Sequence, residues 1–481
     1  MHTTECDVAI IGSGIGGLTC GALLARQGKK VIVFEQHISP GGYASSFIRK
    51  GFIFDAAVHF AFECHQGGLI RHILHLLSSE DETIKFYRID PICKVIFPGQ
   101  SLIIPGDLSR HIEHLVEIFP QEKKGILDLF HTLEVLYSDV RAQKLTSPLL
   151  QQYKEKTFQQ LLEDFIQDKQ LQAIVSAFWC FIATPPFKAA AIPMSMMFMG
   201  LFLQGAYYPE GGFQTLVDSL VKGLKRHGGQ IRLGTGVKKI VVEDGQAVGL
   251  ITQKEEPIKA RYIVSNADAR RTFFEMVGKD FLPTDFTSNL KTLEVCPSAF
   301  NVYLGVDMDL RSVGIDLPQI VVHRSFDYEK EYQAMESFDL ETSTFCVSVH
   351  TLTDPNLAPQ GKHCVSIFTP ALYAPTGWNW KEGKMDFAQG LINQAESVIP
   401  QLSKNIVVQE AATPYTLERY TSNTGGAIAG WAYTSKTAFR KPKPRTPIKN
   451  LYLVGHWTLP GGGISGVATS GWNLSQLLAG K

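Results

Sequence analysis

The first forty residues alternate between short apolar runs and one stretch with helical spacing. Residues 7–11 (DVAII) form a β-branched run, which is typical of a buried parallel strand. Residues 15–28 carry apolar side chains at helical spacing, and 30–35 (KVIVFE) form a second apolar run. Together they predict one βαβ unit at the start of the chain. The helical positions are Leu18, Ala22 and Ala25.

The middle of the chain predicts further elements of both kinds. Helical spacing appears around 108–140 and 155–180, and again at 216–226. Short β-type runs follow this last helix at 230–233, 238–242, 247–252 and 261–264, and others cover 298–306 and 343–369. Because the helix at 216–226 and the runs after it would extend the first sheet, we expect residues 205–290 to return to the first domain.

Charge and cysteine content narrow the function classes. The 46 basic and 46 acidic residues give a formal net charge of zero, so the chain lacks the global positive field of nucleic-acid-binding proteins. The eight cysteines show no CxxC pair and no metal-ligand spacing, so we expect neither a metal site nor a disulfide framework. No secretory signal is visible at the start, and a reducing, cytoplasmic location fits best.

Two stretches could contact a membrane. Residues 189–203 carry no charge, but they number only 15 and include Pro193 and Gly200, whereas a spanning helix needs about 20. They predict a buried helix or tunnel lining, or alternatively an element that dips into a membrane interface. The basic residues Arg440, Lys441, Lys443 and Arg445 lie between prolines and predict a solvated loop, with anionic lipid as the alternative partner.

A glycine motif follows the first strand. Gly12, Gly14 and Gly17 form GxGxxG where the strand meets the helix, and Glu35 ends the next strand. The glycines permit a tight turn, close approach of a pyrophosphate and close helix packing, while Glu35 can accept hydrogen bonds from ribose hydroxyls. The sequence therefore predicts a dinucleotide site. The residues expected at this site are Gly12, Gly14, Ile15, Gly16, Gly17, Glu35 and Gln36.

Two features favour FAD over NAD. The unit continues into Gly41, Gly42 and Tyr43, a glycine-rich extension that would follow more of the cofactor than NAD requires. Near the other end of the sequence, a strand at 451–454 leads into GHWTLPGGGISG and a helix. This tail repeats GxGxxG but leaves no room for a second Rossmann half, so we expect the helix N-terminus at Gly466 and Val467 to face the flavin pyrimidine ring.

In their order along the whole chain, these motifs resemble the phytoene desaturase superfamily, and within it carotenoid cis-trans isomerases and retinol saturases. The resemblance also rests on GFIFDAAVHF, YPEGGFQTL, YIVSNAD and TPYTLERYT. It implies an α/β fold, with a Rossmann-type FAD-binding domain of the glutathione-reductase kind and a second α+β substrate domain with a helical part that faces a membrane. The FAD domain would comprise residues 1–75, 205–290 and 405–481, and the substrate domain 76–204 and 291–404.

The resemblance also assigns cofactor contacts. It places the backbone of Val237 at the adenine, and Gly455, His456 and the Gly466–Val467 pair near the pyrophosphate, ribitol and flavin ring. Two positions depart from the family pattern. Ala57 replaces a usual glycine, and His456 replaces an acidic residue that many relatives carry. Contacts to the ribitol and pyrophosphate are therefore expected to differ in detail.

The implied substrate is a long apolar polyene, carotenoid-like or retinoid-like, bound by apolar burial at a membrane surface. Desaturation, saturation and cis-trans isomerisation share one geometry, and the sequence separates neither them nor the electron donor or acceptor. Candidate acid or base groups are His59, Tyr208 and Glu210, and His59 is also expected beside the flavin. Two alternatives stay open: an amine-oxidase-like flavoenzyme with a soluble substrate, and a non-catalytic FAD-binding protein.

Overall fold

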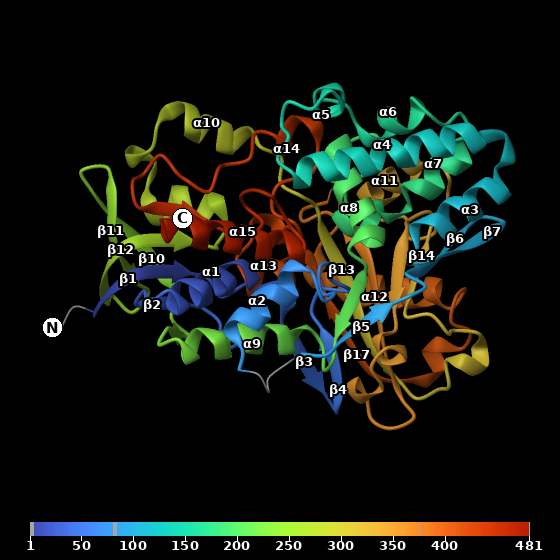
Figure 1. The fold of residues 1–481 in the computed structure, drawn as a ribbon. Helices are drawn as coiled ribbons and strands as arrows, with labels where there is room; N and C mark the ends of the chain where they lie inside the picture. The colour runs from blue at the N-terminus through green and yellow to red at the C-terminus, as the bar shows by residue number, and fades with distance from the viewer. Residues whose placement is uncertain (1–3, 80–83, 376, 481) are drawn as a thin grey trace.

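The structure, a computed structural model, describes residues 4–79, 84–375 and 377–480. Its elements gather around two large sheets that lie side by side (Figure 1). The chain crosses between them several times, so each sheet collects strands from distant parts of the sequence.

The first sheet has the strand order β10-β11-β12-β1-β2-β9, and β18 pairs with the end of β12. β1 runs parallel to β2 and β12, and β2 runs parallel to β9. The β-branched run of β1 is buried, as expected for a strand covered on both faces. The strands are β1 (Thr4–Ile11), β2 (Val31–Phe34), β9 (Gln230–Arg232), β10 (Val237–Glu243), β11 (Gln246–Thr252), β12 (Pro257–Ser265) and β18 (Leu451–Leu453).

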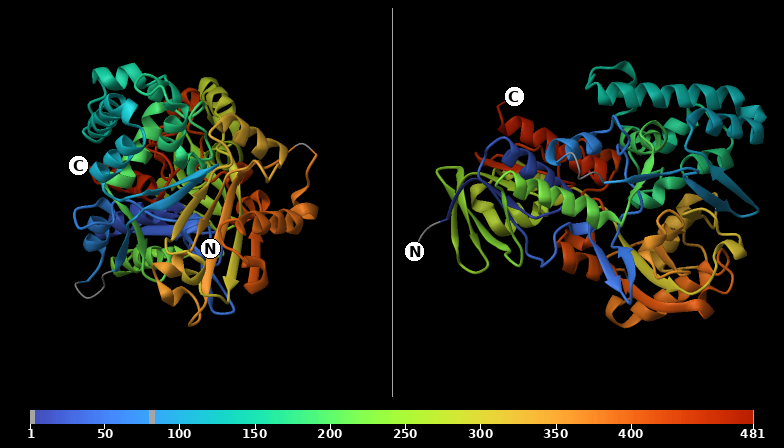
Figure 2. Two further views of the ribbon diagram at one scale, coloured as in Figure 1. Left: turned by 90° about the vertical axis from the view of Figure 1, so that its right-hand side faces the viewer. Right: turned by 60° about the horizontal axis from the view of Figure 1, so that its bottom comes forward.

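Helices from both ends of the chain cover this sheet. α1 (Ile15–Arg26) packs against α15 (Ile464–Leu478), and the right-hand view of Figure 2 shows the two side by side. Gly471 makes the contact close, because a Cβ there would lie 2.6 Å from the carbonyl oxygen of Gly16. α9 (Phe213–Arg226) and α2 (Leu69–Leu77) pack nearby. The predicted βαβ unit is confirmed, and β9, β10, β11 and β12 join this sheet as expected, whereas the wider domain range 205–290 stays a prediction.

The second sheet is mostly antiparallel and has the order β17-β13-β16-β15-β14-β6-β7. Its second strand, β13, lies between β17 and β16 and is buried along its whole length. Phe300, Val302 and Leu304 lie in one apolar cluster with α12 (Trp380–Ala395), whereas Tyr303 points to the other face of the sheet, toward Phe47 and Phe54. The strands are β6 (Cys93–Phe97), β7 (Gln100–Ile104), β13 (Ser298–Val306), β14 (Gln319–Val322), β15 (Phe345–Ser348), β16 (His363–Ala371) and β17 (Ile406–Ala412).

Two short antiparallel pairs link the halves. β3 pairs with β4, and β5 pairs with β8. Their bounds are β3 (Ser46–Arg49), β4 (Phe52–Asp55), β5 (Phe86–Ile89) and β8 (Ala206–Pro209). The division of the chain into two domains remains a proposal. β17 belongs to the second sheet by its pairing with β13, although the expected boundary at 405 put it in the FAD domain.

A helical layer lies over the second half in Figure 1. It contains α3 (Leu108–Ile118), α4 (Lys123–Arg141), α5 (Pro148–Tyr153), α6 (Phe158–Glu163), α7 (Lys169–Val175) and α8 (Ala191–Leu203). The other helices are α10 (Thr284–Thr292), α11 (Tyr328–Ser337), α12 (Trp380–Ala395), α13 (Pro414–Thr421) and α14 (Ser435–Ala438).

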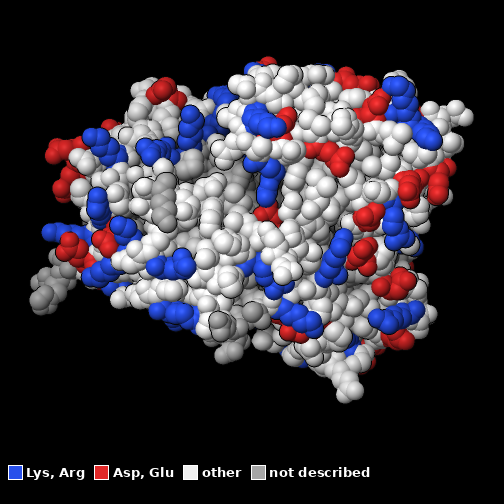
Figure 3. Space-filling view, viewed as in Figure 1, with Lys and Arg blue, Asp and Glu red and all other residues white. Residues whose placement is uncertain are grey.

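α8 is the uncharged stretch that the sequence left between two interpretations. Met194, Phe198 and Met199 are buried, and Leu203 at the end is 39% exposed. The buried-helix interpretation is confirmed, whereas contact of this segment with a membrane interface stays a prediction. Across the described residues, no helix has the length and apolar character needed to cross a bilayer. On the face drawn in Figure 3, acidic and basic side chains are interspersed with broad uncharged areas.

Candidate active site

The loop between β1 and α1 is shaped by glycine. Gly12 has a φ of +92°, in the left-handed region that favours glycine. Gly14 is the N-cap of α1, no side chain caps this helix, and its first turn contains no acidic residue. The free N–H groups and the positive end of the helix dipole therefore suit an anion such as a pyrophosphate.

Asn266, directly after β12, fills the centre of this glycine cradle. A Cβ on Gly14 would lie 2.8 Å from its Nδ2, and one on Gly16 would lie 2.8 Å from its Oδ1. A Cβ on Gly455, from the other end of the chain, would also collide with Oδ1. These positions need glycine because of Asn266 as well as any cofactor. Sequence reasoning missed this residue, although YIVSNAD was among the motifs that carried the family resemblance.

Glu35 is held firmly at the end of β2. Its Oε2 accepts hydrogen bonds from the backbone N of Ser13 at 2.9 Å and from the Ser13 hydroxyl at 2.7 Å. Its Oε1 accepts from the backbone N of His37 at 2.8 Å. The carboxylate is buried at the glycine loop, and its remaining lone pairs can accept from ribose hydroxyls.

The adenine-side residues lie next to Glu35. The backbone N of Thr235 donates to the carbonyl oxygen of Glu35 at 2.8 Å, so Val237, two residues later, begins β10 close by. Gln36 lies toward the surface, and its Nε2 donates to the hydroxyl of Ser422 at 2.7 Å. The arrangement fits the expected contact between Val237 and adenine, which stays a prediction.

The C-terminal loop brings a second uncapped helix N-terminus to the same place. The N-cap of α15 is Gly463, no side chain caps this helix, and its first turn contains no acidic residue. Gly455 donates its backbone N–H to the Ser470 hydroxyl at 3.1 Å, which ties the loop to the helix. The carbonyl oxygen of Gly461 would lie 2.9 Å from a Cβ on Gly466. Residues from both chain ends thus form one cradle that fits FAD.

The extension at Gly41 and Gly42 also joins the cradle. The backbone N of Gly41 donates to the carbonyl oxygen of Ser13 at 3.1 Å, and both glycines have positive φ. The Tyr43 hydroxyl donates toward the carbonyl oxygens of Gly426 and Ala427, each at 3.0 Å. The extension therefore connects the first glycine loop with residues near the end of the chain.

His456, which departs from the family pattern, is a neutral group. Its Nε2 lies 3.2 Å from the Oδ1 of Asn423, which also accepts a hydrogen bond from Trp457 Nε1 at 2.8 Å. Burial, assisted by the charge on Lys441, lowers the pKa of His456 to about 4. The position therefore offers a polar ring but no negative charge at neutral pH.

His59 lies among aromatic rings between the two halves. Its ring stacks on Phe368 with centroids 4.4 Å apart and meets the edge of Phe181 at 5.8 Å. Burial, followed by the effect of His350, lowers the pKa of His59 to about 3. The imidazole is therefore neutral at physiological pH.

A hydrogen-bond chain orients the His59 ring. Its Nδ1 lies 2.9 Å from the hydroxyl of Ser348, and this hydroxyl donates to Gln319 Oε1 at 2.9 Å. Since a hydroxyl has one hydrogen, Ser348 accepts from His59, which puts the proton on Nδ1. Nε2 then carries the free lone pair.

Tyr208 is buried, but its hydroxyl is already engaged. It donates to Asp55, whose carboxylate also accepts from the Ser46 hydroxyl at 2.6 Å and from the backbone N of Phe213 at 2.8 Å. The Tyr208 ring stacks on His350 at 4.5 Å. Burial, followed by the neighbouring Asp55, raises the pKa of Tyr208. Tyr208 therefore braces the strands beside His59.

Glu210 lies apart from these groups. It is exposed at the surface, where it accepts a hydrogen bond from the Tyr87 hydroxyl at 2.7 Å and pairs with Lys85 at 3.5 Å. This hydrogen bond, followed in size by burial acting in the opposite direction, leaves the pKa of Glu210 lowered. Glu210 therefore contacts Tyr87 and Lys85 rather than His59, and the proton transfer that we propose does not involve it.

An aromatic cluster extends from His59 toward α8. Phe181 lies 5.3 Å from Phe60 and 6.1 Å from Phe178, and Phe178 lies 6.4 Å from Phe198 on α8. We call these residues and Phe368 the aromatic cluster. Its members are Phe60, Phe178, Phe181, Phe198 and Phe368.

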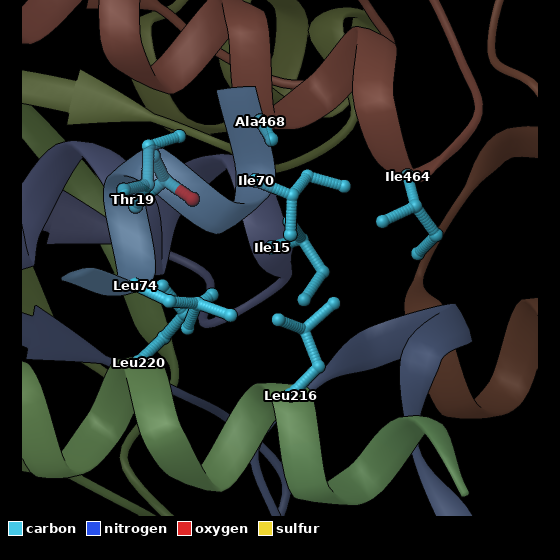
Figure 4. A pocket seen from close by; sticks show the side chains of 9 residues that line it. Ile15, Thr19, Ile70, Leu74, Leu216, Leu220, Ile464 and Ala468 are labelled. Atoms are coloured by element: carbon cyan, nitrogen blue, oxygen red, sulfur yellow. The ribbon is translucent and has the colours of Figure 1, made fainter. Parts of the chain in front are cut away.

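A separate small void lies between α1, α2, α9 and α15, and Figure 4 shows its aliphatic lining. Its volume is about 10 Å³, too small for a substrate. The Thr19 hydroxyl at this void is buried without a hydrogen-bond partner.

Across the described residues, no group of three or more His, Cys, Asp or Glu side chains is placed to hold a metal ion, and all eight cysteines are buried free thiols.

Comparison with protein families gives a match over nearly the whole chain. Residues 15–479 match the family described as flavin-containing amine oxidoreductase. Prolycopene isomerase of Daucus carota is 28% identical to the chain, over 98% of the chain and 79% of that protein. All-trans-retinol 13,14-reductase of Danio rerio is 24% identical, over 94% and 82% respectively. The family resemblance predicted from the motifs is confirmed.

Solved structures share the fold. An oxidoreductase from Methanosarcina mazei has a TM-score of 0.69 at 19% identity, covering 98% of this chain and 100% of that one. Putrescine oxidase has a TM-score of 0.70 at 13% identity, covering all of both chains. The predicted fold class, a Rossmann-type FAD domain with an α+β partner, is confirmed.

Proposed function

The chain belongs to the flavin-containing amine oxidoreductase family, and on this premise we propose that it is an FAD-dependent enzyme that acts on the double bonds of a long apolar polyene. Relatives of the chain are named as an isomerase of prolycopene and a reductase of all-trans-retinol. Both names describe conjugated, apolar substrates, and the two reactions differ in their net electron balance.

The observation that carries the proposal is the aromatic cluster beside His59. Phe368 and Phe181 contact the imidazole, and the rings continue toward buried α8. A polyene offers no charge and few hydrogen-bonding groups, so its binding must come from apolar burial, at about 25 cal/mol per Å². Flat aromatic rings provide such a surface.

The same region does not favour a charged amine substrate. Asp55 is linked to His59 through His350, whose Nδ1 lies 4.0 Å from the Asp55 carboxylate, but Ser46, Tyr208 and Phe213 already donate to this carboxylate. An ammonium substrate would need a free carboxylate or a polar cage to offset its desolvation. No observation favours the soluble-substrate alternative or a non-catalytic role, so neither is proposed.

When bound, FAD supplies a two-electron acceptor or donor at its N5 atom. His59 would act as the proton-transfer group, because its Nε2 lone pair is free while Ser348 holds Nδ1. Phe181 and Phe368 would orient the substrate and exclude water from the imidazole. Tyr208 and His350 would support His59 from behind, since the His350 ring contacts both.

We also propose that the enzyme is peripheral on the cytoplasmic surface of a membrane. Several large apolar side chains are exposed on the helical layer and β7, and a polyene partitions into lipid. They are Ile103, Ile118, Leu127 and Leu145. Sedimentation with neutral and anionic lipid vesicles tests this: we expect Leu127→Ser/Leu145→Ser to bind less than wild type. Equal sedimentation of the two proteins would count against docking by this surface.

The test of function uses purified protein with FAD either oxidised or prereduced, under anaerobic conditions. Each form is incubated with a carotenoid, with retinol and with an unsaturated fatty acid, and products are separated and weighed by mass spectrometry. Product of unchanged mass formed only by the prereduced enzyme indicates isomerisation. A gain of two hydrogens indicates saturation, and a loss indicates desaturation. No conversion of any polyene by the flavin-loaded protein would refute the proposal.

A further inference from the structure

Lys441 is buried, although the sequence predicts a solvated loop at this position. Arg440, Lys443 and Arg445 are exposed, but Lys441 is only 6% exposed. Its Nζ lies 4.2 Å from the ring centroid of Tyr433. Within the described residues it has no ion-pair or hydrogen-bond partner. The prediction of a fully solvated basic loop was therefore wrong at this one residue.

The groups around Lys441 provide no counter-charge. Burial raises the pKa of Cys296 and of Tyr433 to about 12 each, so both stay protonated. Burial also keeps His456 neutral, with a pKa of about 4. Burial lowers the pKa of Lys441 itself to about 8, so at neutral pH the ammonium remains charged among uncharged groups.

Such an arrangement costs stability. Burying an unpaired ion is unfavourable, and a cation–π contact offsets only part of that cost. Lysine elsewhere in the same loop, at Lys443, reaches solvent. A buried cation without an anion in the protein is therefore placed for an anion that binds there.

The neighbouring backbone identifies where this anion would lie. Lys441 Nζ is 3.4 Å from the position of a Cβ on Gly461. The carbonyl oxygen of Gly461 in turn lies 2.9 Å from the position of a Cβ on Gly466. Gly466 belongs to the first turn of α15, whose N-cap Gly463 leaves the backbone N–H groups free. The ammonium and the positive helix end thus flank one short turn.

We propose that Lys441 and the N-terminus of α15 form one anion site, and that its occupant is the negatively charged reduced isoalloxazine ring of FAD. The inference rests on the proposed FAD-dependent function but does not depend on the substrate. The oxidised ring is neutral. Transfer of a hydride, which is two electrons and one proton, from a substrate C–H bond would leave one extra negative charge on the ring, and loss of a second proton from the neighbouring carbon to His59 would complete the double bond of the neutral product. Lys441 would stabilise that charge, as a positioning cation outside proton transfer.

The experiment compares Lys441→Met with Lys443→Met, a matched change in the same loop at an exposed lysine. Lys441→Arg keeps the charge and serves as the conservative variant. Two properties of the bound flavin are measured without any polyene: its midpoint potential, and its affinity for sulfite, which adds to oxidised flavin and leaves the ring negatively charged. For Lys441→Met we expect at least tenfold weaker sulfite binding and a tenfold shift toward the oxidised flavin, about 30 mV for two electrons. Lys443→Met should match wild type, and Lys441→Arg should lie near it.

A second measurement keeps the inference open to refutation if Lys441→Met loads little FAD. Since the substitution removes an uncompensated buried charge, we expect the apoprotein to unfold at a higher urea concentration than wild type. Wild-type potential and sulfite affinity in a flavin-loaded Lys441→Met protein would overturn the inference. So would an apoprotein that is destabilised, because that result would make Lys441 a structural residue. Failure of wild type to convert any polyene would instead refute the proposed substrate and leave this inference standing.

Discussion

Replacing Gly14 by alanine separates two reasons for the glycine in the first loop. The structure gives Gly14 a φ of −64°, which alanine can adopt without strain. A Cβ there would meet Asn266 Nδ2 at 2.8 Å and Cγ at 3.9 Å, with no other atom among its nearest contacts. The clash therefore comes from one side chain, and Asn266→Ala should remove it.

The magnitude follows from two contributions to the free energy of unfolding. Overpacking costs about 1–3 kcal/mol, and we expect about 1 kcal/mol because the end of the Asn266 side chain can turn aside. Alanine is also a poorer N-cap than glycine, by up to about 1 kcal/mol. Gly14→Ala should therefore destabilise the apoprotein by about 2 kcal/mol. Only the first part should be recovered with Asn266→Ala, as a coupling energy of about 1 kcal/mol.

Urea unfolding of the apoprotein supplies the four free energies of this double-mutant cycle. Gly17→Ala is the comparison variant, because its Cβ would collide mainly with the carbonyl oxygen of Gly12, and it would also lie 3.1 Å from Asn266 Cβ, which alanine retains, and 3.3 Å from Asn266 Cγ. Its coupling to Asn266→Ala should therefore be smaller than that of Gly14→Ala. FAD titration should show at least tenfold weaker binding for Gly14→Ala even with Asn266→Ala present, since the pyrophosphate still needs the close backbone. A coupling below about 0.3 kcal/mol for Gly14 would refute the role given to Asn266.

Three further predictions concern single side chains. His59→Gln should keep the flavin spectrum but slow polyene conversion by about 10²–10⁴-fold, because glutamine can donate to the serine but cannot transfer a proton; unchanged rates would remove His59 from the mechanism. Thr19→Val should raise the free energy of unfolding by about 1 kcal/mol by removing an unsatisfied hydroxyl, whereas Thr272→Val should lower it, because that hydroxyl donates to a backbone carbonyl; two shifts of the same sign would contradict this. Burial lowers the pKa of His111 to about 3, so the unfolded chain binds the extra proton below pH 6.5 and stability falls by about 1.4 kcal/mol per pH unit from there down toward pH 3. His111→Leu should remove this loss and His114→Leu, at an exposed position, should not; parallel pH profiles for all three proteins would count against the assignment.

The local pattern of apolar residues and glycines was sufficient to predict several strands and helices, including those that form the cofactor site. The strand at 298–306 has the predicted bounds, and the helix after the first glycine motif begins at Ile15 as predicted and ends at Arg26, two residues before the predicted end. The glycine motif also predicted the uncapped start of α1, because Gly12, with a φ of +92°, permits the tight turn that begins this helix. Such features depend on neighbours in sequence and can be read from it.

Features that depend on contacts between distant segments could not be read in this way. Asn266 reaches Gly455 across the sequence, and β17 joins the second sheet through β13. Lys441 has the same local composition as its exposed neighbour Lys443, and only the packing of Tyr433 and Gly461 around it decides its burial. Glu210 follows a buried strand but turns outward to Tyr87.

The packing of α15 against α1 has a consequence for biosynthesis. The first Rossmann strand and helix are made long before β18 and α15, which complete the cradle. A nascent chain therefore has only part of the pyrophosphate site and an uncovered apolar face on α1 until α15 has been made, and binding of FAD can report that synthesis has passed α15.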